Sequence, residues 1–320
     1  GLDSDTAVDG PKLPEFPDVP SWIAAIQGAS EAFRLPHEGR ATPLVLDDGA
    51  VYLDRYWRYE DRFTRAVRAR VGDSVSDLDP IALEAGLDQL FGTENPGDLQ
   101  RLAARTAVLN RIAVVSGGPG TGKTAVVVKV LALLNHLAGD TLPRVMLVAP
   151  TGKAAARLSE SIRAKMEDPD WVPTALQADI SPISSTIHSA LGVVNIELPR
   201  FRHDADNPLP IDVLVVDEAS MVDLPLMAKL VDAVPPDARL ILLGDPDQLV
   251  SVEMGSVLGD VCKAAQDRES GLSGVHVHLL RTWRYPENSG IEAFIRNNFE
   301  RNGVPNHFRL LKLERGTDLY

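Results

Sequence analysis

A glycine-rich loop that ends in Lys-Thr does most to constrain what this chain can fold into. Residues 117–124 read Gly-Gly-Pro-Gly-Thr-Gly-Lys-Thr, and they follow the mostly apolar run 111–116. A strand, this loop and a helix over 123–137 fit the phosphate-binding spacing G-x-x-x-x-G-K-[ST], the P-loop. The glycines let backbone N–H groups turn toward phosphate oxygens, and the helix start adds positive potential. We therefore expect a nucleotide-binding fold.

The side chains of this loop predict ATP and Mg²⁺ as cofactors. Lys123 would reach the β- and γ-phosphates, and Thr124 would hold Mg²⁺. The residues expected to contact ATP are Gly118, Pro119, Gly120, Thr121, Gly122, Lys123 and Thr124. A flexible surface loop is the alternative, but the strand before it and the helix after it disfavour that interpretation.

Downstream of the loop, short apolar runs alternate with helical segments. We expect strands at 111–116, 145–149, 213–216 and 240–243, followed by helices at 123–137, 152–165, 225–234 and 256–263. This pattern predicts an α/β fold with a parallel sheet that helices cover on both faces. Ligands of such sheets bind at the carboxyl ends of the strands, where these motifs begin.

Two of these strands end in polar residues that could act on a phosphate. Asp217 and Glu218 follow the strand at 213–216. Asp217 would bind Mg²⁺ and Glu218 would orient the attacking water, although a helix-capping acid pair is the alternative. Gln248, after the strand at 240–243, is a candidate sensor of the γ-phosphate or the water, whereas Asp245 and Asp247 could serve only the turn.

Composition excludes several classes of protein. The formal net charge is −13, which argues against a generally basic nucleic-acid coat but not against a local basic groove. The single cysteine, Cys262, excludes a disulfide framework and is expected to be a buried apolar side chain. No run reaches the roughly 18 apolar residues of a membrane span, so we expect a cytoplasmic protein without membrane contact.

Two histidines and two further segments complete the candidates. His276 and His278 could meet a metal on one strand face, but ordinary strand histidines are the favoured interpretation. The segment with Pro150, Thr151 and Lys153 ends a strand and opens a helix, which suits a phosphate that need not belong to the nucleotide. The segment with Thr186 and His188 is similar. Solvated side chains are the alternative for both.

These motifs, in this order, resemble superfamily 1 helicases and, among them, the RecD family, the alpha subunit of exodeoxyribonuclease V (the RecBCD complex). The resemblance covers about residues 40–295. It is carried by residues 116–124, 149–158, 186–192, 217–223, 244–249, 251–259, 284–285 and 289–291. The resemblance implies ATP-driven 5′→3′ movement along single-stranded DNA, in a complex with the other subunits of an exodeoxyribonuclease V.

The resemblance also implies roles for individual residues. Gln100 matches the glutamine that reads adenine, and Arg284 matches an arginine that contacts phosphate, here counted with the catalytic residues. The positions that match DNA contacts are Pro150, Thr151, Lys153, Thr186 and His188. The N-terminal module of the family docks on a partner subunit, and residues 1–90 here carry 17 acidic and 9 basic side chains, a net charge of −8.

The resemblance implies a P-loop RecA-like sheet with a second, incomplete RecA-like domain. We expect a small α+β partner-docking module at 1–92 and the ATP-binding domain at 93–275, with a short insertion around 193–210. Residues 276–320 would begin the second domain, but only about 40 residues follow Arg281, too few for that domain. The chain therefore looks like a truncated RecD.

Three alternatives stay open at this point. One is a stand-alone superfamily 1 relative that works without nuclease partners. Another is a nucleotide-binding interaction module that docks on a partner and hydrolyses nothing, since a motor moves one half against the other. An unrelated P-loop ATPase such as a kinase is disfavoured, because it does not explain residues 149–158 and 186–192.

Overall fold

The computed structural model describes residues 18–29, 32–36, 39, 41–75, 78–93, 98–139, 141–177, 182–195, 200–248, 256–267 and 270–281. The chain forms two compact units, residues 1–58 and 59–320. The division falls inside helix α2 (Asp54–Arg70), between Arg58 and Tyr59. In the described part of the chain, no helix is long and apolar enough to cross a membrane.

The first unit contains helix α1 (Val19–Gly28) and a three-stranded sheet in the order β1-β2-β3. Strand β1 (Phe33–Arg34) runs parallel to β2 (Leu44–Asp47), and β2 forms a hairpin with β3 (Ala50–Leu53). Asp48 and Gly49 turn the hairpin with positive φ angles of 46° and 76°. Arg34 donates to the Asp54 carboxylate at 2.6 Å and joins the sheet to the start of α2.

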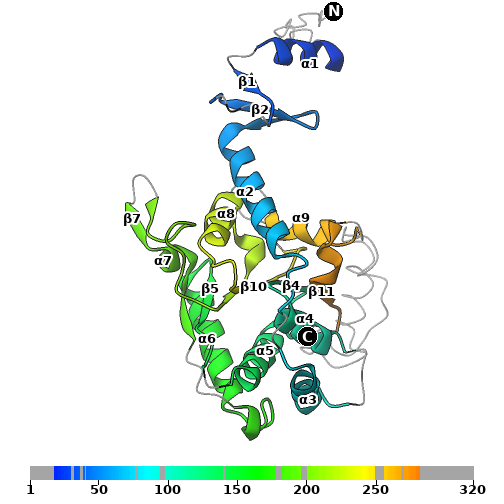
Figure 1. The fold of residues 1–320 in the computed structure, drawn as a ribbon, viewed down its shortest axis with the longest axis vertical. Coiled ribbons are helices and arrows are strands. Elements are labelled where there is room, and N and C mark those ends of the chain that lie inside the picture. The colour runs from blue at the N-terminus through cyan, green and yellow to red at the C-terminus, as the bar shows by residue number, and fades with distance from the viewer. Residues whose placement is uncertain are drawn as a thin grey trace, which may run out of the picture. The chain divides into compact units, whose positions relative to one another are not determined.

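The second unit is built on a six-stranded parallel sheet in the order β11-β4-β10-β9-β5-β6 (Figure 1). Its strands are β4 (Ile112–Gly117), β5 (Val145–Ala149), β6 (Ile183–Thr186), β9 (Val213–Val216), β10 (Arg239–Gly244) and β11 (His276–Leu279). The central strands are almost continuously apolar because both faces are buried. This confirms the predicted α/β fold.

Helices cover both faces of this sheet, and alternate strand residues enter different cores. Ala113 and Val115 of β4 pack with α3 (Pro80–Phe91), α4 (Leu99–Leu109), α5 (Lys123–Leu137) and α6 (Gly152–Met166). Ile112 and Val114 pack with α7 (Ile187–Leu191), α8 (Leu224–Asp232), α9 (Val257–Ala264) and part of α2. The side-chain period of two residues in a strand explains this division.

Shorter elements connect these layers. They are the 3₁₀ turns η1 (Thr174–Leu176), η2 (Ala219–Met221) and η4 (Leu272–Gly274), and the strands β7 (Val193–Asn195) and β8 (Arg200–Phe201). Strands β7 and β8 pair antiparallel, which makes part of the expected insertion around 193–210 a hairpin.

The division of the chain differs from the expected boundaries at residues 92 and 275. Leu83, Leu87 and Leu90 of α3 are buried in the core that α5 shares, so residues before 92 belong to the larger unit. Strand β11 pairs in parallel with β4, which extends the same sheet beyond residue 275. Residues 282–320, where we expect a second domain, lie outside the described residues.

Candidate functional site

The P-loop curls around the amine of Lys123 at the carboxyl end of β4. Gly120 and Gly122 have φ angles of 79° and 93°, a conformation that glycine adopts at little cost. Lys123 is the first residue of α5, and its Nζ donates to the carbonyl oxygens of Gly117 and Gly118 at 2.5 and 3.0 Å. The structure therefore holds the ammonium group where the loop would receive phosphate.

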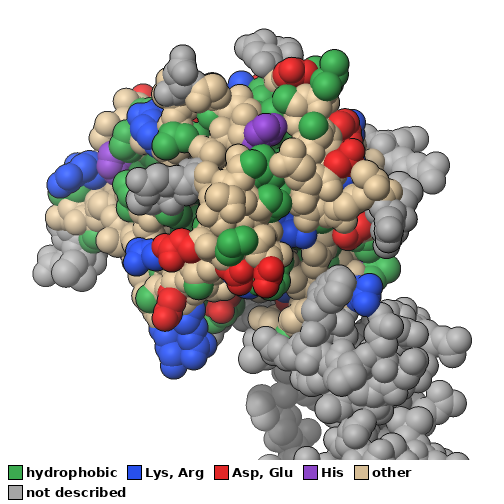
Figure 2. All heavy atoms as spheres, turned by 90° about the horizontal axis from the view of Figure 1, so that it is seen from below, with side chains coloured by type: hydrophobic (Ala, Val, Ile, Leu, Met, Phe, Trp, Pro, Cys, Tyr) green, Lys and Arg blue, Asp and Glu red, His purple; other side chains and the backbone are tan. Residues whose placement is uncertain are grey.

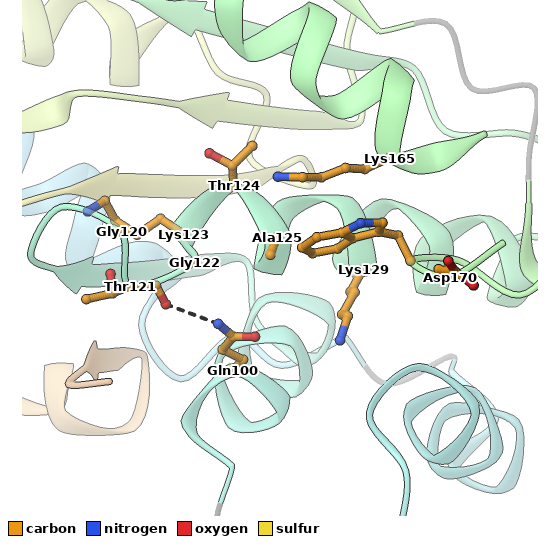
Figure 3. A pocket seen from close by; sticks show the side chains of 11 residues that line it. Gln100, Gly120, Thr121, Gly122, Lys123, Thr124, Ala125, Lys129, Lys165 and Asp170 are labelled. Carbon is orange, nitrogen blue, oxygen red and sulfur yellow. Dashed lines mark hydrogen bonds between the residues drawn. The ribbon is translucent and has the colours of Figure 1, made fainter. Parts of the chain in front are cut away.

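A cavity of about 740 Å³ opens beside this loop (Figure 3). Its lining residues are Gln100, Gly120, Thr121, Gly122, Lys123, Thr124, Ala125, Lys129, Lys165, Asp170 and Trp171. The Gln100 amide Nε2 donates to the Thr121 carbonyl at 3.0 Å, which ties α4 to the loop. Gly118 contributes its carbonyl oxygen to Lys123, and Pro119 is exposed. A cavity of this size suits a nucleotide-sized ligand.

Two predicted carboxylates follow β9, two strands away from β4 in the sheet order. Burial raises the pKa of Asp217, and the Lys123 ammonium opposes that shift only in part. Asp217 Oδ1 accepts a hydrogen bond from the Glu218 backbone N–H at 2.9 Å. Burial and the neighbouring Asp217 charge raise the pKa of Glu218, while Arg157 lowers it. Glu218 has a φ of 51°, one of two non-glycine residues with positive φ among the described residues.

A third carboxylate, Asp245, follows β10, the strand that lies between β4 and β9 in the sheet. Its side chain is 6% exposed and accepts a hydrogen bond from the Asp247 N–H at 3.1 Å. Burial raises its pKa, and Lys123 again opposes the shift. Sequence reasoning gave Asp245 only a turn role, although its place directly after a buried strand was a usable signal. Gln248 is exposed, and its backbone N–H donates to the Asp245 carbonyl at 3.2 Å.

These groups fit Mg²⁺. Asp217 is partly buried and Asp245 is buried; burial raises the pKa of each carboxyl, and the Lys123 charge opposes both shifts. Hard oxygen ligands of this kind suit Mg²⁺, which keeps several waters and takes only one or two carboxylates beside phosphate oxygens.

The predicted DNA-contacting residues gather at the neighbouring strand ends. Strands β5 and β6 pair Ala149 with Thr186, so the starts of α6 and α7 lie next to each other. Thr151 Oγ1 accepts from the Ala154 N–H at 3.2 Å and caps α6. Thr186 Oγ1 accepts from the Ser189 N–H at 3.2 Å and caps α7. Both helix starts therefore face the carboxyl edge of the sheet, as an anion site requires.

The remaining members of this group are accessible. Lys153 and His188 are exposed, and the His188 ring lies 6.1 Å from the Phe201 ring, centroid to centroid. Pro150 is half-buried at the end of β5. A groove of about 780 Å³ runs beside them between α6 and β6, with Ser184, Ser185 and Thr186 in its lining. Figure 2 shows one face of the molecule, on which both Lys and Arg side chains and Asp and Glu side chains are exposed.

The chain is similar to known proteins over most of its length. A family model described as an AAA domain matches residues 100–254. The "RecBCD enzyme subunit RecD" of Mycolicibacterium smegmatis is 41% identical over 268 residues, which are 82% of this chain. The "ATP-dependent RecD2 DNA helicase" of Deinococcus radiodurans is 32% identical over 75% of this chain. The chain belongs to the RecD family. It spans 45% of the length of the first relative and 30% of the second.

Solved structures resemble the chain more distantly. A Pif1 helicase from Bacteroides in complex with ADP-AlF3 and ssDNA is 20% identical, with 63% of this chain and 45% of that chain covered. The TM-score is 0.34, too low to bear on function. The RecD motif arginine predicted at Arg284, and the motif over 251–255, lie outside the described residues.

The two histidines of strand β11 lie near one buried hydroxyl. Ser116 Oγ lies 2.8 Å from His276 Nε2 and 2.8 Å from His278 Nδ1, and Ser116 is fully buried at the end of β4. Burial, followed by the neighbouring His278, lowers the pKa of His276. These histidines therefore fix β11 against the strand that leads into the P-loop. Cys262 is buried as expected, which raises its thiol pKa to about 11.

Proposed function

We propose that this chain binds ATP with Mg²⁺ in the P-loop cavity, as the ATP-binding part of a helicase subunit that moves 5′→3′ along single-stranded DNA. In this proposal it works with the other subunits of an exodeoxyribonuclease V complex, in the cytoplasm where that DNA lies. One observation carries the proposal: the Lys123 ammonium lies inside the P-loop, and its charge lowers the pKa of the partly buried Asp217 and of the buried Asp245 against the effect of burial. That is the arrangement a nucleoside triphosphate needs.

In this proposal, residues of the chain bind the phosphates and take the proton from the attacking water during hydrolysis. Backbone N–H groups of the P-loop would bind the phosphates, and Lys123 would exchange the carbonyls of Gly117 and Gly118 for phosphate oxygens. Glu218 would take a proton from the water that attacks the γ-phosphorus, as the bond to the β-phosphate oxygen breaks. Its raised pKa makes it a better proton acceptor than an ordinary glutamate. Mg²⁺, held by Thr124 and Asp217, would neutralise charge on the phosphates.

Movement requires that DNA be bound near this chemistry. Thr151, Lys153, Thr186 and His188, with Pro150, lie at the same carboxyl edge of the sheet as the P-loop. We assign them to backbone phosphates of single-stranded DNA, because helix starts and a lysine read charge rather than base sequence. The roles of Gln100 in adenine contact, Gln248 in sensing and Arg284 in phosphate contact belong to the same proposal.

The greater similarity to the RecBCD subunit than to the RecD2 helicase, 41% against 32% identity, favours a subunit over a stand-alone helicase. A non-hydrolysing nucleotide-binding module is the remaining alternative, and a single experiment separates it. ATP binding and ATP hydrolysis would be measured with and without single-stranded DNA, with Lys123→Ala as the blank. Turnover stimulated by DNA supports the proposal, binding without turnover supports the module, and no binding refutes both.

A further inference from the structure

The nucleotide cavity has a wall that the P-loop motif does not supply. Besides the loop, Ala125 and Gln100, it is lined by Lys129, Lys165, Asp170 and Trp171. Phosphates that occupy the P-loop leave the base of the nucleotide to Gln100, which is proposed above to contact adenine, and to this second set. Trp171 is the aromatic side chain among the lining residues, and it is 37% exposed. Its indole therefore offers an accessible flat surface to a ligand in the cavity.

The backbone around Trp171 is firmly held. The Trp171 N–H donates to the Asp168 carbonyl at 3.0 Å, and the Asp170 N–H donates to Asp168 Oδ1 at 2.9 Å. The next residue, Val172, is fully buried, and its carbonyl accepts from the Gln177 side chain at 3.0 Å. The turn after α6 therefore presents the indole from a fixed position, which is what a binding residue requires.

Lys165 completes this wall. Its Nζ lies 4.6 Å from the centroid of the Trp171 ring, within the range of a cation–π contact. Figure 3 shows its side chain reaching from α6 toward the first turn of α5, where Thr124 lies. Burial lowers its pKa. Lys129, in contrast, directs its amine to Phe91, 4.0 Å from the ring centroid, and so is engaged elsewhere.

We propose that Trp171 packs against the base of the bound nucleotide, with the Lys165 ammonium holding the indole in place. This inference rests on the proposed function, because it names the base contact of the same ATP site. An indole is a flat π surface and stacks on any base, most strongly on purines. Asp170 cannot take this role, since a carboxylate offers no such surface.

The test separates the base from the phosphates. Binding of ATP and of inorganic tripolyphosphate, both with Mg²⁺, would be measured by calorimetry on the wild-type chain and on Trp171→Ala. Stacking on an aromatic side chain is worth enough that its removal should weaken ATP binding about tenfold. Tripolyphosphate has no base, so its affinity should not change. Trp171→Phe keeps an aromatic face and should lose less ATP affinity than the alanine variant.

Two controls make the result specific. Trp22→Ala removes another exposed tryptophan, 46% exposed, that lies outside the cavity lining, and it should bind ATP as the wild type does. Lys165→Met should weaken ATP binding, whereas Lys229→Met, which removes a similar contact with Tyr59, should not. If Trp171→Ala fails to fold, the effect of Lys165→Met on ATP binding still tests the proposed contact between the indole and the base.

Each failure has a distinct meaning. Unchanged ATP affinity in Trp171→Ala and Lys165→Met would overturn this inference and leave the proposed function standing. Equal losses for ATP and tripolyphosphate would also overturn it, because they would show damage to the P-loop rather than a lost base contact. Absence of ATP binding in the wild-type chain would refute the proposed function itself. Quenching of tryptophan fluorescence by ATP, lost in Trp171→Phe, would support the contact directly.

Discussion

Gly117→Ala should destabilise the fold where the sheet leads into the P-loop. The Gly117 backbone has a φ of 156°, and an added Cβ would lie 2.7 Å from the Leu279 carbonyl oxygen and 2.8 Å from Thr121 Oγ1. The carbonyl belongs to β11, which is paired with β4 and cannot move aside without loss of that pairing. Overpacking of this kind costs about 1–3 kcal/mol, and the positive φ adds about 1 kcal/mol for a residue with a Cβ.

The expected total of about 2–4 kcal/mol is large enough to measure by thermal unfolding. Each kcal/mol shifts Tm by roughly 2–4 °C in a domain of about this size, so Tm should fall by about 5–15 °C. Gly118→Ala is the matched control, because nothing lies within 4 Å of its added Cβ and it should melt as the wild type does. An unchanged Tm for Gly117→Ala would refute the packing of β11 against the P-loop. So would equal losses in both variants.

Four further predictions concern the charged groups of the site. Lys123→Ala removes charge-assisted hydrogen bonds to phosphate and should lower ATP affinity about 100-fold. Lys153 is exposed, and Lys153→Ala should weaken the binding of single-stranded DNA but not of ATP. Fluorescence titrations with ATP and with single-stranded DNA check both predictions. Glu218→Gln should keep ATP binding and stop turnover in a hydrolysis assay, and retained turnover would exclude Glu218 as the proton acceptor. Burial raises the pKa of Asp217, so stability falls as the pH rises from the ordinary aspartate pKa to the raised one, and the loss is complete above it. Asp217→Asn should therefore raise Tm near neutral pH, by an amount that shrinks as the pH falls toward the ordinary aspartate pKa. A gain in Tm that does not depend on pH would contradict this cause.

Much of the sheet could be predicted from the sequence because its strands are buried on both faces. Strands β4, β5 and β9 are short apolar runs, and α5 and α6 follow them with helical periodicity. No bounds were predicted for strand β6, since Ile183-Ser-Ser-Thr is a polar edge strand whose exposure removes the apolar signal. Helix α3 was missed although it carries usable signals, an Asp79 cap and a proline at its start.

The site was predictable to the extent that its residues follow strands. Lys123, Asp217 and Glu218 lie at the carboxyl ends of β4 and β9, where the fold concentrates binding groups. Lys165 and Trp171 come instead from the end of α6 and the turn after it. Their place in the cavity depends on how α6 packs against α5, a tertiary contact that no local pattern encodes. Local pattern therefore indicated the phosphate end of the cavity but not its other wall.

The electrostatics of the site indicate how nucleotide binding would be coupled to the rest of the chain. Asp217, Glu218 and Asp245 follow adjacent strands, and burial raises the pKa of each, so the fold holds three carboxyls in surroundings that disfavour their charge. A bound Mg²⁺ and a Lys123 shifted to phosphate would change the charge that each carboxyl meets. Because β9 also borders β5, whose end precedes the Thr151 cap, a change at these carboxyls would lie one strand away from the segment that we propose for DNA contact. In that proposal, the ATP site and the DNA site lie at neighbouring strand ends of a single sheet.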